Sequence, residues 1–299
     1  MVRAGRVEKI RGRAERLRDN PLFVIVHLID GTYELFRHFY GIRRGSAMPP
    51  RYSAVAGVLH TVAQMLEEGA THVAVATDHV IESFRNEMWP GYKTGAGIDP
   101  LLWAQFHPLE TALMAMGVVT WPMIEVEADD ALASAALLAS RDRAVEKVCI
   151  WTPDKDLAQC VVGDRVVQVD RKSGQIRGEE GVRAKFGVTP ERIPDFLALV
   201  GDAADGYPGI PRFGKKTAAS VIGRHGAIEQ FPAAVLGDHH ESALLFKRLA
   251  TLRSDVALFD DIEALRWRGP EPEFEAMASA IGDARIVTRV RALAAKHGW

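Results

Sequence analysis

The sequence predicts an α/β fold built on a mixed, mainly parallel β-sheet with flanking helices. Three apolar runs rich in β-branched residues, at 23–29, 72–77 and 148–152, have the pattern of strands that are buried on both faces. Between the first two runs, residues 53–68 carry apolar side chains at helical spacing. A strand, a helix and a second strand in this order indicate a β-α-β unit.

The composition is that of a globular protein with a full-sized core. Of its 299 residues, 47% are hydrophobic and 25% are charged, which fits one large domain and an appended smaller one. The longest apolar runs are too short to span a bilayer, and the N-terminus has no apolar signal-peptide core. Cys149 and Cys160 lie in or beside apolar runs, which favours reduced thiols over a disulfide framework or a zinc cluster. We therefore expect a cytoplasmic protein with no targeting signal and no membrane partner.

Residues 1–20 form a basic leader. Its basic residues are Arg3, Arg6, Lys9, Arg11, Arg13, Arg16 and Arg18, set against Glu8, Glu15 and Asp19. Charge-rich segments usually stay on the surface, so a solvated helix or a loose tail is the favoured interpretation. The alternative is a sequence-independent contact with phosphate groups.

Each of the three predicted strands delivers acidic side chains at its carboxyl end. The first run ends at Asp30, the second ends at Asp78, and the third is followed by Asp154 and Asp156. In open parallel sheets ligand sites form at these ends, because the loops there diverge over a crevice. One Asp after a strand is commonly a turn residue, but that explanation does not account for three strands that end in the same way.

A further group of acids, Glu127, Asp129 and Asp130, begins a predicted helix that continues through the apolar residues 131–138. A first helical turn tolerates acids on local grounds, because its free N–H groups and the helix dipole are positive there. Three acids in four residues nevertheless repel one another, with Glu127 and Asp130 on one face and Asp129 on the next. The cluster predicts a bound cation.

Residues 79–100 interrupt the sheet pattern and indicate a mobile segment over the acids. Residues 84–93 mix bases with aromatics, among them Arg85, Tyr92 and Lys93, and residues 94–100 are rich in glycine. One interpretation is that the bases merely neutralise the acids. If the substrate is a phosphodiester, the bases would instead hold the scissile phosphate while the aromatics stack on nucleobases.

The second half of the chain adds a predicted helical hairpin. After a structural stretch with a strand near 166–169 and a helix near 180–186, a helix at 193–200 precedes Asp202 and Asp205, which share a face if they lie on a helical turn. A tight turn at Gly214 would leave free N–H groups at a helix N-terminus beside Lys215 and Lys216, which suits a DNA phosphate without base readout. The alternative is an incidental Gly-Lys turn. Beyond residue 230 we expect packing helices with buried Leu244, Leu245, Phe246, Leu249 and Leu252.

The order of these motifs resembles the 5′-nuclease domain of bacterial DNA polymerase I and the stand-alone bacterial and phage 5′-3′ exonucleases, which are akin to eukaryotic flap endonucleases. The resemblance covers about residues 23–259. It rests on Ile29-Asp30-Gly31, Arg37, Thr77-Asp78, Phe84-Arg85, Tyr92-Lys93, Glu127 to Asp130, Asp154-Lys155-Asp156, Gly201 to Asp205, Pro208-Gly209 and Gly214 to Ala218. It implies a PIN-like α/β nuclease domain over residues 21–188 with a helical arch at about 79–106. A helix-three-turn-helix DNA-binding and C-terminal helical region is implied over residues 189–299.

The resemblance also implies the roles of the site residues. One Mg²⁺ or Mn²⁺ ion would be held directly or through water by Asp30, Asp78, Glu127, Asp129 and Asp130, and a second by Asp154, Asp156, Asp202 and Asp205. Lys93 and Arg85 would contact the scissile phosphate. DNA would be bound by Arg37, Tyr92, Gly209, Gly214, Lys215, Lys216 and Thr217, with K⁺ at the hairpin. If the nine carboxylates are ligands, the formal net charge of −2 becomes +7 for the remaining surface, so the charge does not argue against a nucleic-acid partner.

Three positions depart from the family pattern. Ala96 stands where the family usually carries an Arg, and Arg212 stands where the hairpin normally has a Gly. Ala204 replaces a Ser before the last metal-site Asp. The first departure bears on the rate, and the other two bear on the backbone geometry and K⁺ binding of the hairpin.

We expect a structure-specific 5′-nuclease, both 5′-3′ exonuclease and 5′-flap endonuclease, that hydrolyses DNA phosphodiesters by a two-metal-ion mechanism. Its partners would be DNA with 5′ ends, flaps or nicks, including RNA-primed ends, and its role the removal of RNA primers or flaps in replication and repair. No polymerase domain follows in this sequence, so a stand-alone enzyme is expected. We also expect it to be a monomer. Two alternatives stay open: a PIN-type ribonuclease, which would not need the hairpin, and a branched-DNA binding protein with weak catalysis, suggested by Ala96.

Overall fold

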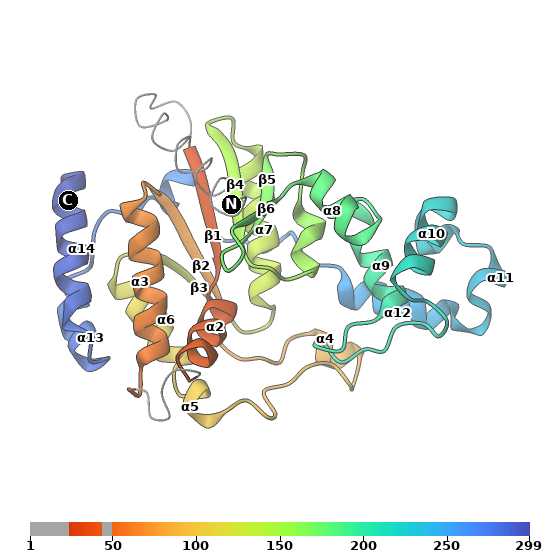
Figure 1. Ribbon diagram of the computed structural model, residues 1–299, viewed down its shortest axis with the longest axis horizontal. Helices are drawn as coiled ribbons and strands as arrows, with labels where there is room; N and C mark the ends of the chain where they lie inside the picture. The colour runs from red at the N-terminus through yellow and green to blue at the C-terminus, as the bar shows by residue number, and fades with distance from the viewer. Residues whose placement is uncertain (1–23, 44–49) are drawn as a thin grey trace.

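The computed structural model describes residues 24–43 and 50–299, so the basic leader at 1–20 lies outside the described residues. The centre of the described structure is a six-stranded sheet in the order β3-β2-β1-β4-β5-β6 (Figure 1). The strands are β1 (Val24–Asp30), β2 (His72–Asp78), β3 (Val119–Met123), β4 (Val145–Trp151), β5 (Val166–Asp170) and β6 (Gln175–Arg177). Neighbours from β3 to β5 pair in parallel and β6 pairs antiparallel with β5, which confirms the predicted mixed, mainly parallel sheet.

Alternate residues of the central strands point into two separate cores. Ile25 and Ile29 of β1 share a core with α3 (Ser53–Glu67) and α6 (Phe106–Ala115), whereas Val26 and Leu28 share one with α7 (Ala128–Arg141). A strand covered on both faces needs apolar residues at nearly every position, which explains the continuous runs in the sequence. Helix α2 (Gly31–Arg43) follows β1 directly and packs against α3.

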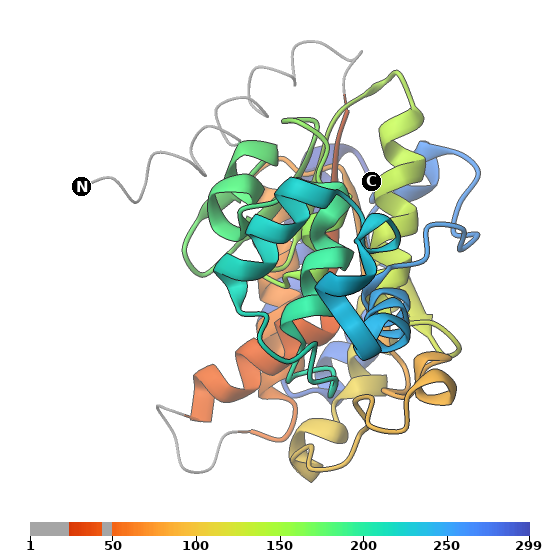
Figure 2. The ribbon, with the colours of Figure 1, turned by 90° about the vertical axis from the view of Figure 1, so that its right-hand side faces the viewer.

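Residues 179–250 form a helical body with a core of its own, which Figure 2 places nearest the viewer. Its helices are α8 (Glu179–Phe186), α9 (Ile193–Val200), α10 (Lys215–His225), α11 (Ala233–Leu236) and α12 (His240–Ala250). Three short 3-10 turns also lie in this body, η2 (Pro190–Arg192), η3 (Ile228–Gln230) and η4 (Gly237–His239), while η1 (Asp156–Cys160) precedes it and η5 (Ile262–Leu265) follows it. Phe196 of α9, Ile222 of α10 and Phe246 of α12 meet in the core of this body.

The C-terminal segment returns to the sheet. Helix α13 (Phe274–Ala280) packs on α6 and α14 (Ala284–His297) packs on α3, and Phe274, Ile286 and Val290 join the core that contains β1 and α3. In Figure 1 these helices lie at the opposite end of the molecule from α10 and α11. The predicted C-terminal helical region of residues 189–299 thus includes two helices, α13 and α14, whose apolar stripes cover α6 and α3, and the predicted domain boundaries stay a prediction.

The segment between β2 and α6 is mostly irregular. Only α4 (Arg85–Met88) and α5 (Pro100–Trp103), of four residues each, are helical within residues 79–105. Pro90, Gly91, Gly95 and Gly97 disfavour a longer helix. The expected helical arch is therefore corrected to a looped segment with two helical turns. Among the residues that the structure describes, no helix has the length and hydropathy of a membrane span.

Candidate metal centre and nucleic-acid interface

Four carboxylates converge where β1, β2 and β4 end and α7 begins. Asp30 and Asp78 are the last residues of β1 and β2, Asp154 follows β4, and Asp129 lies in the first turn of α7. Because β1 pairs in parallel with both β2 and β4, these strand ends meet at one edge of the sheet. Burial, and then the charges of Asp78 and Asp154, raise the pKa of Asp30 to about 7. Burial and the charges of Asp154 and Asp30 raise the pKa of Asp129 well above its ordinary value.

Backbone and hydroxyl donors aim these carboxylates. Asp30 Oδ1 accepts a hydrogen bond from the Tyr33 N–H at 2.8 Å, and its Oδ2 accepts one from the Thr152 hydroxyl at 3.0 Å. Asp78 Oδ1 accepts one from the Ala128 N–H at 2.8 Å. Asp30 thus satisfies a free N–H at the start of α2, and Asp78 satisfies one at the start of α7. The first turns of α2 and α7 therefore fix the side chains of Asp30 and Asp78 at the carboxyl edge of the sheet.

A second group consists of Asp156, Asp202 and Asp205, whose candidate ligand oxygens all lie within 4.8 Å of one another. Asp156 begins η1, and the other two lie in a tight loop in which the N–H of Asp202 donates to Tyr207 O at 2.8 Å. The two acids are therefore brought together by this closed loop and not by the helical turn that their spacing suggested. Burial and then the charges of Asp154 and Asp205 raise the pKa of Asp156 well above its ordinary value.

The donor set fits a divalent cation. Asp156 Oδ1 is buried and has no hydrogen-bond partner, so a ligand atom is left over at the centre of the second group. The exposed Asp154 links the two groups, since its charge raises the pKa of Asp30 and Asp129 on one side and of Asp156 and Asp205 on the other. Carboxylate oxygens alone suit Mg²⁺ or Mn²⁺ better than zinc.

Two lysines partly balance this charge. Lys93 Nζ lies 2.6 Å from Glu127 Oε2 and 3.3 Å from Asp205 Oδ1, so it bridges helix α7 and the second acid group. Although burial lowers it, the pKa of Lys93 is raised well above its ordinary value by the charges of Glu127 and Asp205. Lys155 forms an ion pair with Asp202. The side chain of Lys93 remains 26% exposed, so a phosphate can still reach it.

The structure gives Arg85 and Asp130 a different position from the predicted one. The Arg85 side chain is 1% exposed and forms a bidentate ion pair with Asp130, which is completely buried. Both oxygens of Asp130 are engaged with donors, and Glu127 Oε1 accepts hydrogen bonds from Arg85 and from the Ser83 hydroxyl. The expectations that Arg85 contacts the scissile phosphate and that Asp130 binds a metal ion are corrected accordingly.

Two further predicted DNA contacts, Tyr92 and Gly209, are placed differently, and a third, Arg37, is held by an ion pair. Tyr92 is buried, with its hydroxyl 3.4 Å from Glu127 Oε2, so its ring is not free to stack on a base. Gly209 is buried at φ 73°, and a Cβ there would lie 2.4 Å from Gly201 N, so close backbone packing explains this glycine. Arg37 is bound to the buried Glu34 at 2.5 Å and is 27% exposed, so its DNA contact stays a prediction.

The hairpin before α10 presents its predicted residues to solvent. Gly214, Lys215, Lys216 and Thr217 are all exposed, and the Gly214 N–H donates to the Thr217 hydroxyl at 2.8 Å. Arg212, where the family normally has a Gly, adopts a φ of 74°, the left-handed conformation that favours glycine. The departure therefore carries backbone strain in the turn. The predicted phosphate contacts of the lysines stay predictions.

Sequence reasoning missed Ser83 and Thr152 as supports of the acids. Ser83 directly precedes the Phe84-Arg85 motif, and Thr152 lies two positions before Asp154. A hydroxyl donor next to a motif was thus the only sign in the sequence that these residues support the acids. Lys155 lies between Asp154 and Asp156 in the sequence, and this position indicates an ion pair with an acid of the site such as the one with Asp202. Ser83 contacts Glu127 across 44 positions in the sequence, and no local pattern indicates that pairing.

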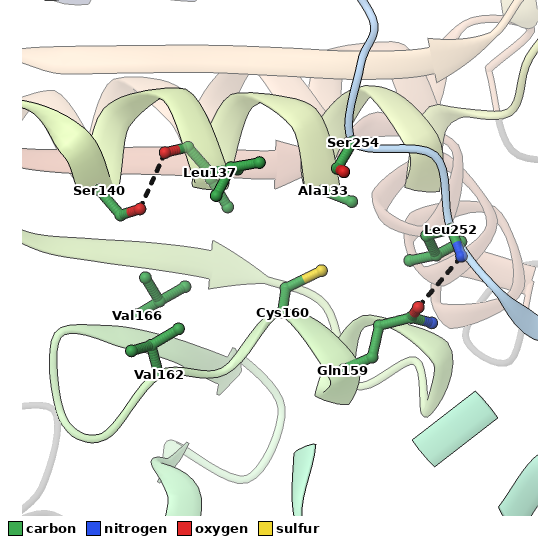
Figure 3. Close-up of a pocket in the computed structure, with 10 residues that line it drawn as sticks. Ala133, Leu137, Ser140, Gln159, Cys160, Val162, Val166, Leu252 and Ser254 are labelled. Atoms are coloured by element: carbon green, nitrogen blue, oxygen red, sulfur yellow. Dashed lines mark hydrogen bonds between the residues drawn. The ribbon is translucent and has the colours of Figure 1, made fainter. Parts of the chain in front are cut away.

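A pocket of about 250 Å³ lies between α7, η1 and residues 252–254 (Figure 3). None of its ten lining residues is charged, and Ala133, Leu137 and Val162 make much of its wall apolar. Burial and then the charges of Asp129 and Asp130 raise the pKa of the Cys160 thiol, which therefore stays protonated at neutral pH. The pocket offers packing space and no catalytic group.

Residues 25–187 match the family described as "5′-3′ exonuclease, N-terminal resolvase-like domain", and residues 188–273 match "5′-3′ exonuclease, C-terminal SAM fold". The chain is 34% identical over 277 residues to DNA polymerase I of Pseudomonas aeruginosa, which covers 84% of this chain and 29% of the polymerase. It is 28% identical over 265 residues to a 5′-3′ exonuclease of Buchnera aphidicola, which covers 81% of this chain and 90% of that protein. The chain thus spans less than a third of the length of the polymerase relatives.

Solved structures show the same fold. Bacteriophage T5 5′-exonuclease with bound divalent metal ions (zinc) has a TM-score of 0.62 at 17% identity, over 90% of this chain and 98% of that chain. The catalytic core of Rad2 in complex with a DNA substrate has a TM-score of 0.57 at 14% identity, over 95% and 98% of the two chains. These matches confirm the predicted PIN-like α/β fold. With both family matches in the same order and almost contiguous, the chain belongs to the 5′-3′ exonuclease family of nucleases.

Proposed function

We propose that this protein is a divalent-metal-dependent, structure-specific 5′-nuclease that hydrolyses DNA phosphodiesters, both as a 5′-3′ exonuclease and as a 5′-flap endonuclease. The observation that carries the proposal is the pair of acid groups that share Asp154 beside the ammonium of Lys93. Similarity to bacteriophage T5 flap endonuclease in complex with DNA and metal ions supports a DNA substrate and divalent ions.

In the proposed site, the first acid group would hold one Mg²⁺ or Mn²⁺ ion and the second group another, with Asp154 between them. Bound ions supply Lewis acidity to the reacting phosphate. The chain's own contribution is orientation: Asp30 and Asp78 are fixed by the starts of α2 and α7, and the Asp202 loop is closed on itself. Lys93, held between Glu127 and Asp205, would donate to a non-bridging oxygen of the scissile phosphate.

The hairpin would grip the duplex away from the cut. Lys215 and Lys216 are exposed at the start of α10, where the helix dipole also favours a phosphate. K⁺ at this turn is part of the proposal, with carbonyl oxygens of the turn as its ligands. A dependence of duplex affinity on K⁺ that Na⁺ does not reproduce would support the K⁺ site. Cleavage of flaps, nicks and RNA-primed ends in replication and repair, by a monomer, completes the proposal.

One experiment separates this function from its two rivals. End-labelled 5′-flap DNA, nicked duplex and single-stranded RNA are each incubated with the protein, with Mg²⁺ or with EDTA. We expect cleavage of the flap and the nicked duplex in Mg²⁺ only. Cleavage of the RNA alone would favour a PIN-type ribonuclease, which would share the carboxylates. Tight flap binding without cleavage would favour a branched-DNA binding protein, as Ala96 first suggested.

A further inference from the structure

Arg85 is a buried cation that the proposed chemistry leaves unused. Its side chain is 1% exposed, and each of the five N–H groups that an arginine carries finds an acceptor. Toward α7, it donates to the two oxygens of Asp130 at 2.7 Å each and to Glu127 Oε1 at 3.0 Å. Toward α12, it donates to Leu249 O at 2.8 Å and to Thr251 O at 3.1 Å. One guanidinium therefore joins the start of α7 to the end of α12.

Asp130 strengthens the same junction. Its Oδ1 accepts a second hydrogen bond from the Arg253 N–H at 2.8 Å, and its Oδ2 accepts one from the Glu127 N–H at 3.0 Å. The carboxylate thus holds the chain that leaves α12 and closes the first turn of α7. A lysine in place of Arg85 would keep the charge, but its single ammonium group cannot reach both helices in a planar fork.

The segment that begins at Arg85 also reaches the second acid group. Trp89 Nε1 donates to Gly206 O at 3.0 Å, and the Lys93 N–H donates to Asp205 O at 3.0 Å. At the end of the segment, Lys93 Nζ contacts both Glu127 and Asp205. Residues 85–93 therefore connect α7, which carries Asp129 of the first acid group, with α12 and with the 202–207 loop, which carries two acids of the second group.

We propose that Arg85 is a positioning residue for the nuclease reaction. It fixes Glu127 on one side while Lys93 is held on the other, so that the ammonium and both acid groups keep the spacing that cleavage requires. Arg85 touches neither substrate nor ion in this role. The inference rests on the proposed function, and it predicts that loosening Arg85 slows the chemical step without weakening DNA binding.

The test compares Arg85→Lys with wild type and with Arg291→Lys, an exposed arginine of α14 that is paired with Glu275 far from the site. Single-turnover cleavage of a labelled 5′-flap is measured at saturating enzyme and Mg²⁺, and flap affinity is measured in Ca²⁺ at several salt concentrations. We expect the rate of Arg85→Lys to fall about 10- to 100-fold, because small misplacements of reacting groups have effects of that size. Affinity and its salt dependence should match wild type, and Arg291→Lys should behave as wild type throughout.

Ser83→Ala provides a milder variant that keeps the fold intact. It removes the 2.8 Å hydrogen bond from the Ser83 hydroxyl to Glu127 Oε1 and the 3.4 Å hydrogen bond that this hydroxyl accepts from the Arg85 N–H, so a smaller loss of rate with unchanged affinity is expected. If Arg85→Lys does not fold, this variant decides, and a wild-type rate for Ser83→Ala would overturn the proposal.

Two other results would also overturn it. A loss of affinity and of salt dependence in Arg85→Lys would mean that Arg85 contacts DNA. A lower melting temperature with a wild-type rate would mean that Arg85 only stabilises the fold. Failure of the wild-type protein to cleave any DNA would instead refute the proposed function, and is seen before any variant is tested.

Discussion

Replacing Asp30 with asparagine should stabilise the metal-free protein, and the stabilisation should grow with pH. Burial and the neighbouring acids raise the pKa of Asp30 from its ordinary 3.8 to about 7. Between these two values the folded chain binds more protons at this site than the unfolded chain does, so the stability contributed by Asp30 falls as pH rises through that window. Asparagine carries no charge and avoids this loss.

The size of the effect follows from the two pKa values. The raised pKa of Asp30 costs about 2 kcal/mol of stability at pH 5, where only the unfolded chain has released the proton, and about 4 kcal/mol at pH 8, relative to a neutral side chain. The advantage of Asp30→Asn should therefore increase by about 2.5 kcal/mol between pH 5 and pH 8. For a protein of 299 residues that corresponds to roughly 4 °C in melting temperature.

Asparagine can keep the local hydrogen bonds. Its Oδ1 can still accept from the Tyr33 N–H, and the Thr152 hydroxyl, now facing an amide N–H₂, can turn to accept in place of donating. The effect should therefore reflect charge and not lost packing. Added Mg²⁺ should stabilise wild type at pH 8 more than Asp30→Asn, while the variant loses most cleavage and binds DNA as tightly as wild type or more tightly.

The assay is thermal unfolding followed by circular dichroism at pH 5 and pH 8, in EDTA and in Mg²⁺. Asp238→Asn, at an exposed position of the helical body, is the matched control and should show no such pH trend. An advantage of Asp30→Asn that is constant or that shrinks as pH rises would refute the reasoning that Asp30 is destabilised by burial among other acids. Wild-type turnover by Asp30→Asn in Mg²⁺ would refute its place in the metal centre.

Three further predictions concern exposed positions outside the acid groups. Changing Lys215 and Lys216 to Glu should weaken the binding of flap and duplex DNA, and of single-stranded DNA less. The dependence of log affinity on log salt concentration should become shallower by roughly one unit per lost phosphate contact. An unchanged slope in a salt titration would mean that the two lysines make no phosphate contact. Ala96→Arg should raise the single-turnover flap rate with little change in affinity, because an exposed site regains a phosphate donor of the kind worth about 2.7 to 4 kcal/mol elsewhere. A rate equal to or below wild type would show that nothing was missing. Arg212→Gly should raise stability by up to about 1 kcal/mol in urea unfolding, since relief of the φ of 74° outweighs the added freedom of the unfolded chain, and a lower midpoint would contradict this.

The strand-end acids could be predicted from the sequence because their cause is local. Apolar runs that stop at Asp30 and Asp78 indicate both the strands and their carboxyl ends. Because the strands pair in parallel, these ends lie at the same edge of the sheet. Arg85 could not be placed in this way, because its acceptor Leu249 O lies 164 positions away and a basic residue beside aromatics reads equally well as a DNA contact. The spacing of Asp202 and Asp205 is compatible with a helical turn, but Gly201 and Gly206, both at a φ of 83°, close the segment as a loop.

Packing helices are expected beyond residue 230, but the sequence does not indicate what a helix such as α14 packs on. Amphipathic spacing identifies the buried face of a helix and leaves its partner open, so residues 189–299 could be predicted to be helical, but not to divide their packing between the helical body and the sheet. The partner is α3, with Arg289 of α14 bound to Glu67 at 2.5 Å.

This return of the chain has a consequence for the order in which the protein assembles during synthesis. Glu67 and Arg289 are separated by 222 positions, and the whole helical body is made between them. The face of α3 that α14 covers therefore stays exposed during synthesis until α14 has left the ribosome. Residues 179–250 can already form their own hydrophobic core by then. Contacts of such long separation form slowly, because the intervening loop must be closed first. The helical body is then connected to the sheet at both of its ends. Its motions relative to the sheet are therefore restricted to those that keep α14 packed on α3.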